Sequence, residues 1–78
     1  MALEMFKMVT LQEDEYKLRR GDVATIVERH PASDEDGYSL EVFNAIGETI
    51  AVVTVAESQI KLLTANQVLH ARLLEEAV

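Results

Sequence analysis

The sequence predicts an all-β fold, a small β-barrel of about five strands, followed by a C-terminal α-helix. Up to residue 63, short apolar runs alternate with polar clusters, which is typical of short strands joined by turns. The runs are rich in Val, Ile and Thr, which favour strands. From Thr64 the apolar residues follow a helical period instead. We therefore expect a single domain over residues 1–78, with the barrel at about 5–63 and the helix at about 65–77.

The first two predicted strands are separated by a long polar loop. Residues 5–11 alternate between two faces, as a strand does. Residues 12–20 are polar and charged, and the glycine that follows them supports a turn. Residues 23–27 are apolar on both faces, which indicates a central strand.

A hairpin is expected in the middle of the chain. Residues 30–37 contain the only proline, three consecutive acids and a glycine, so they are read as a loop. Two strands, at about 38–43 and 49–55, then flank the turn formed by residues 44–47. The glycines expected in structural turns are Gly21, Gly37 and Gly47.

The end of the predicted barrel consists of a single turn at 56–59 and a short closing strand at 60–63. A helix is expected to start at Thr64, because Thr64 and Gln67 have the spacing of a capping box. Five short strands, a long first loop, a central hairpin and a one-turn helix before the last strand are the layout of an SH3-like barrel.

Three segments carry a resemblance to a known family: residues 21–27, 38–42 and 47–55. With them, the chain from Phe6 to Leu63 resembles the bacterial domain of unknown function 4926 family, whose members are small SH3-like proteins. The resemblance implies an SH3-like fold. Members of the family are sometimes encoded beside small putative toxins, so it also implies a neutralising role, as an antitoxin or immunity-like partner.

A weaker resemblance, carried by residues 21–27, is to the KOW motif of ribosomal and transcription proteins. It implies an alternative function, contact with RNA or the ribosome. Ala24 stands where the KOW pattern usually has a second glycine, and the basic residues that make RNA contacts in KOW domains are few here.

Charge and composition exclude several classes of function. The chain has 14 acidic and 7 basic residues, a formal net charge of −7, which opposes binding to nucleic acid and favours a basic protein partner. It has no cysteine, so disulfides and thiolate metal sites are excluded. Neither a membrane-spanning apolar run nor a signal peptide is found, so a cytoplasmic protein without membrane association is expected.

No catalytic, cofactor-binding or metal-binding residues are predicted, because the sequence has no nucleophile motif, phosphate-binding loop or ligand spacing. Residues 34–36 are read as a solvated loop rather than a cation site. A small-ligand-binding barrel or enzyme that uses the loop carboxylates and His30 is kept as an alternative function. The first loop carries a candidate contact for an anion or a partner, unless its cations pair with the acids of the same loop: Lys17, Arg19 and Arg20.

The C-terminal segment carries the strongest functional signal. As a helix it presents one stripe that requires burial, and this stripe is the predicted interface: Leu69, His70, Leu73, Leu74 and Ala77. The stripe could pack on the chain's own barrel or on another chain. The predicted function is a non-enzymatic protein-interaction module that forms homo-oligomers and binds a further protein, such as a small basic one.

Overall fold

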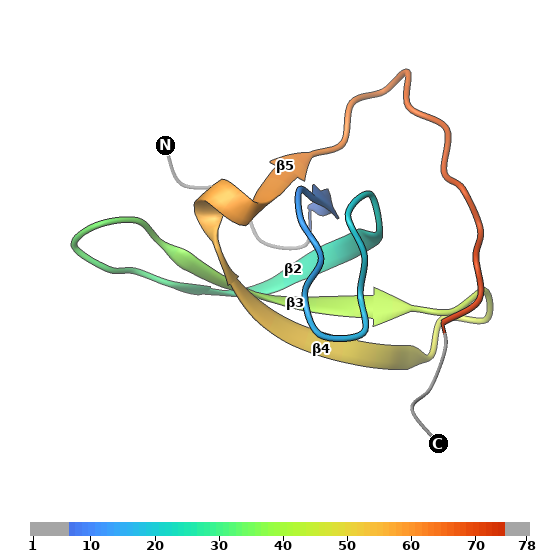
Figure 1. The fold of residues 1–78 in the computed structure, drawn as a ribbon, viewed down its shortest axis with the longest axis horizontal. Helices are drawn as coiled ribbons and strands as arrows, with labels where there is room; N and C mark the ends of the chain where they lie inside the picture. The colour runs from blue at the N-terminus through green and yellow to red at the C-terminus, as the bar shows by residue number, and fades with distance from the viewer. Residues whose placement is uncertain (1–6, 75–78) are drawn as a thin grey trace.

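The computed structural model describes residues 7–74, which form one five-stranded antiparallel sheet (Figure 1). Its strand order is β4-β3-β2-β1-β5, so β4 and β5 are the outer strands. In chain order the elements are β1 (Met8–Leu11), β2 (Val23–His30), β3 (Gly37–Phe43), β4 (Thr49–Ala56), the 3-10 turn η1 (Glu57–Gln59) and β5 (Ile60–Leu62). Each strand lies within one or two residues of its predicted position, except that β1 starts later and β2 continues to His30. Residues 5 and 6 of the first predicted strand lie outside the described part of the chain.

Two irregularities interrupt the pairing of neighbouring strands. Between β2 and β3 the register shifts after Ile26, so Val27 has no partner opposite it. Between β3 and β4, Val42 pairs with Ala51 and Phe43 with Thr49, which leaves Ile50 as the extra residue. An extra residue bends a strand and changes the direction of nearby side chains. The second irregularity lies beside the β3–β4 turn, where Ile50 is 41% exposed.

The core lies on the concave side of the sheet, where alternate residues of the strands meet. Tyr38 is fully buried in it, yet its hydroxyl donates a hydrogen bond of 3.0 Å to Glu57 Oε1 in η1. A buried phenol is tolerated because that hydroxyl has a partner. The buried core residues are Val9, Leu11, Leu18, Ala24, Ile26, Tyr38, Leu40, Val55 and Ile60.

The predicted C-terminal α-helix is wrong. No α-helix occurs in residues 7–74, and residues 68–74 have no regular secondary structure. The fold of these residues is therefore all-β, with five strands and one 3-10 turn, and lacks the predicted C-terminal helix. The remainder of the predicted helix, including Ala77, lies outside the described residues.

Only half of the predicted capping box at Thr64 forms, because the Thr64 hydroxyl donates to Asn66 Oδ1 at 2.6 Å, and no helix follows it. Thr64 N–H donates to Gln67 Oε1 at 2.7 Å, and Gln67 N–H donates to the Thr64 carbonyl at 3.1 Å. The chain then continues in an extended form. A short helix is only marginally stable in water unless one face packs on the protein. An extended chain also advances about twice as far per residue as a helix. Residues 72–74 can therefore reach Asp22 and the turn between β3 and β4.

Two of the three glycines lie in turns that require a positive φ. Gly21 has φ +92° and Gly47 has φ +84°. Around Gly47 the turn is held by Asn44, whose Oδ1 accepts hydrogen bonds from the backbone N–H groups of Ile46 (3.1 Å) and Glu48 (2.9 Å). Gly37, expected in a turn, is instead the first residue of β3 and lies opposite His30 and Ala56.

Candidate functional site

Residues 63–74, here called the tail, run from β5 across to the turn between β3 and β4 (Figure 1). Residues 64–73 are exposed, although the side chain of Arg72 is only 30% exposed, whereas Leu63 and Leu74 at the two ends are half-buried. Leu74 packs against the buried core. The tail is thus attached near its ends and lies in solvent between them.

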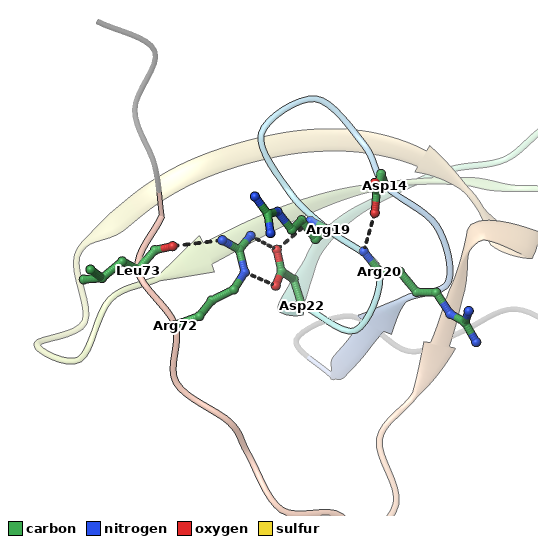
Figure 2. Close-up of polar contacts among 6 residues, drawn as sticks. All are labelled: Asp14, Arg19, Arg20, Asp22, Arg72 and Leu73. Atoms are coloured by element: carbon green, nitrogen blue, oxygen red, sulfur yellow. Dashed lines mark hydrogen bonds and ion pairs between the residues drawn. The ribbon is translucent and has the colours of Figure 1, made fainter.

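An ion pair holds the far end of the tail to the first loop. Arg72 Nε donates to Asp22 Oδ1 at 2.7 Å, and Arg72 Nη2 also pairs with Asp22 Oδ2 (Figure 2). Arg72 Nη1 in turn donates to the carbonyl of Leu73 at 2.9 Å, which orients the guanidinium. A two-point pair between a guanidinium and a carboxylate is stronger and more specific than a single ionic contact. We call the Asp22–Arg72 pair the clasp.

Asp22 is also positioned by a contact that does not involve the tail. Its Oδ2 accepts a hydrogen bond of 2.7 Å from the backbone N–H of Arg19, across the turn that contains Gly21. Burial alone would raise the pKa of Asp22, but the bonds from Arg72 and Arg19 and the charges of both arginines outweigh it and lower that pKa below its usual value. Asp22 is therefore ionised at neutral pH and ready to bind a cation.

Between the end of the tail and the sheet lies a pocket of about 610 Å³. Four large apolar side chains line it while remaining exposed, two on the β3–β4 hairpin and two on the tail. Their exposed fractions are 43% for Phe43, 41% for Ile50, 58% for Leu69 and 88% for Leu73. We call these four residues the apolar rim.

The structure brings most of the predicted interface residues to this pocket, although they are not on a helix. Leu69, His70, Leu73 and Leu74 all line it. Of these, Leu74 packs on the chain's own core, whereas Leu73 is largely in solvent. The fifth predicted residue, Ala77, lies outside the described part.

The three cations of the first loop do not form one site. Lys17 lies at the loop tip, its Nζ 5.5 Å from the centre of the Tyr16 ring. Arg19 lies beside Asp22, and its backbone N–H is used there. Arg20 donates its backbone N–H to Asp14 Oδ1 at 3.0 Å, and its guanidinium points away from the clasp (Figure 2).

Several carboxylates gather around η1, at the other end of the first loop. Gln59 Nε2 donates to Glu13 Oε1 at 2.6 Å and to Glu15 Oε2 at 3.4 Å, which ties that loop to η1. Glu57 accepts from the buried Tyr38 hydroxyl at 3.0 Å. These donors are neutral, so they orient the carboxylates without cancelling their charge.

The acidic loop between β2 and β3 is organised by contacts within the chain. Asp36 accepts from Arg29 Nε at 2.8 Å and from the Ala32 N–H at 3.3 Å, and the Arg29 bond lowers the pKa of Asp36. Glu35 accepts from Ser58 Oγ at 2.8 Å. Of the described residues, no three acids or histidines are grouped so that they could hold a metal ion.

His30 was expected in a loop but is the last residue of β2. Its Nε2 lies 2.7 Å from Ser39 Oγ on β3, the next strand, and 3.5 Å from Glu28 Oε1. Both strands are part of the sheet, so His30 has a position set by strand pairing.

No helix in the part of the chain that the structure describes is long and apolar enough to cross a membrane.

The clasp and half of the apolar rim could not be predicted from the sequence. The two clasp residues are 50 positions apart, and no sequence pattern links them. Phe43 and Ile50 were assigned to strands without a role. Two large apolar residues flanking a hairpin turn were the available signal, but the strand irregularity that leaves Ile50 without a partner could not be read from the sequence.

The described residues define a small all-β domain with an exposed apolar rim and a tail held by an ion pair. The chain belongs to the family described as domain of unknown function (DUF4926), whose model matches residues 5–62. This confirms the family expected from the sequence, and the matched region spans all five strands. No curated protein and no solved structure gives a significant match to the chain.

Proposed function

We propose that this chain is a non-enzymatic protein-interaction module that binds a partner protein through its apolar rim. The observation that carries the proposal is the grouping of Phe43, Ile50, Leu69 and Leu73 around one pocket, each at least 41% exposed. Single exposed apolar side chains are common on proteins, but a continuous group of them marks an interaction surface.

The charge of the chain supports a basic partner. The net charge of −7 attracts a basic protein over a distance and speeds its encounter with the rim. Glutamates around η1 accept hydrogen bonds from the neutral side chains of Tyr38 and Gln59. A small basic protein, neutralised by this chain in an antitoxin or immunity-like role, is the partner that fits both the charge and the rim.

A photo-crosslinking amino acid in place of Leu73 tests the proposal, with the same substitution at Ser33 as the matched control. Both positions are exposed, but Ser33 lies in the β2–β3 loop, away from the rim. In cells, position 73 should crosslink to a distinct protein that position 33 does not reach.

The crosslinked protein is then purified and titrated against the chain. Leu73→Asp should weaken this binding at least about tenfold, which corresponds to roughly 1.4 kcal/mol. Ser33→Asp, which adds the same charge, should leave the affinity unchanged. Equal crosslinking at both positions, or equal affinities of the two variants, would show that the rim is not the binding surface.

A further inference from the structure

The tail is attached to the rest of the chain mainly at its two ends. All of residues 64–73 are exposed, and the attachment at the far end depends on the clasp and on Leu74. Between the two attachment points, residues of the tail line two pockets, of about 610 Å³ and 340 Å³, together with residues of the strands and the first loop. Val68 and Leu73 are 91% and 88% exposed, so release of the tail would cost little at these side chains.

The surface that receives the tail is built without it. Asp22 is positioned by the N–H of Arg19, and the core against which Leu74 packs consists of residues from the strands and the first loop. A negative carboxylate beside an apolar surface complements any extended segment that has an arginine followed two residues later by a leucine. This chain carries that segment itself, as Arg72, Leu73 and Leu74.

We infer that two copies of the chain exchange their tails, so that Arg72 of each copy closes the clasp on Asp22 of the other. The long exposed stretch before Arg72 allows the end of the tail to reach a neighbouring copy. Exchange of an identical element is a common route to symmetric dimers, because every contact made within one chain is made again between the two.

The exposed apolar side chains of the tail contribute little to holding it on its own chain. Val68, Leu69 and Leu73 are 91%, 58% and 88% exposed when the tail lies there. Exchange of the tails therefore leaves these side chains about as exposed as before, and Leu69 and Leu73 stay part of the rim. The net charge of −7 on each copy opposes pairing in general, so the complementary charges of Asp22 and Arg72 are required to hold the partner's tail in place.

Charge reversal on each side of the clasp tests the inference. Asp22→Arg places two arginines at the clasp, and Arg72→Asp places two aspartates there, so each variant alone should be a monomer by light scattering. An equimolar mixture should form dimers, because each tail then meets an opposite charge only on the other variant. The double variant Asp22→Arg/Arg72→Asp should pair with itself as the wild type does.

Arg20→Asp is the matched control, since the Arg20 guanidinium lies on the same loop and points away from the clasp (Figure 2). It changes the net charge as Arg72→Asp does, and it should leave pairing intact. A mixture that stays monomeric while the double variant is folded would show that the clasp closes only within one chain. A wild type that is monomeric at every concentration would also overturn the inference.

A second measurement avoids the risk that Asp22→Arg fails to fold because the Arg19 N–H loses its acceptor. Wild-type chains labelled with ¹³C are mixed with unlabelled ones, and nuclear Overhauser effects between different chains are recorded. Exchange predicts such effects between Leu74 and the buried core, and their absence contradicts it. The inference does not depend on the proposed partner protein, because crosslinking from position 73 to a distinct protein reports on the rim, whereas the mass of the charge-reversal variants reports on pairing of two copies.

Discussion

At the scale of single residues, the fold depends on a few positions whose backbone or charge is unusual. Gly47 closes the β3–β4 turn with φ +84°, a conformation in which residues with a side chain are strained. Asp22 accepts hydrogen bonds from the first loop and from the tail at once. Both positions act on the same end of the molecule, where the apolar rim lies.

Gly47→Val should lower the free energy of unfolding by roughly 1–2 kcal/mol. A Cβ at this position would meet no atom within 4 Å, so the cost comes from the backbone conformation rather than from a clash. Gly47→Asn is the matched control, because asparagine tolerates positive φ, and it should cost less. Thermal or urea unfolding of both variants measures the difference. Equal losses would mean that φ is not the cause.

The clasp should make stability depend on pH in the acid range. The pKa of Asp22 is lowered in the folded chain, so its contribution is present above its unfolded pKa of about 3.9 and is lost as pH falls through the lower folded value. The stability difference between wild type and Asp22→Asn should thus be constant near neutral pH and shrink below about pH 4. In an Arg72→Ala background most of that pH dependence should disappear. A difference that stays constant into strong acid would contradict the clasp.

At the scale of elements, the strands could be predicted from the sequence and the tail could not. Residues 49–55 are rich in Val, Ile and Thr, a local signal that predicts a strand, and β4 lies there as predicted. The tail has an equally clear helical pattern, and the Gln67 half of its capping box forms. Its course beyond Gln67 is decided by contacts with Asp22 and the core, which come from distant parts of the chain. Local periodicity contains no information about such contacts.

In the extended tail, the adjacent residues Leu73 and Leu74 have different surroundings. On a helix Leu73 and Leu74 would share one stripe, but here Leu74 packs against the core while Leu73 is 88% exposed. Leu74→Asp should lower the free energy of unfolding by roughly 1–3 kcal/mol, whereas Leu73→Asp should change it by less than about 0.5 kcal/mol. Urea unfolding followed by circular dichroism compares the two. A larger loss for Leu73→Asp would favour the helical stripe instead.

At the scale of the whole molecule, charge determines which partners the surface can meet. The candidate cations of the first loop, Lys17, Arg19 and Arg20, each contact a different residue, and acidic residues exceed basic ones by two to one. The KOW-like alternative would require them to bind phosphates together. The rim and the net charge together favour a protein partner of opposite charge.

The purified chain should therefore show no appreciable binding to RNA at physiological salt, because its net charge of −7 opposes the phosphate backbone. Fluorescence anisotropy with a labelled single-stranded RNA measures this. The variant Arg20→Gln, which removes one positive charge from the first loop, should give the same result as the wild type. Micromolar binding that weakens steeply with salt, and that Arg20→Gln reduces, would support the KOW-like function instead.

The apolar rim, the clasp and the exchange of tails all require that the tail be extended and docked. Backbone chemical shifts and nuclear Overhauser effects of residues 64–74 in solution test this requirement directly. A docked tail predicts extended shifts after residue 67, together with effects between the Arg72 and Asp22 side chains and between Leu74 and the core. Continuous helical shifts through residues 65–74, without those effects, would contradict it.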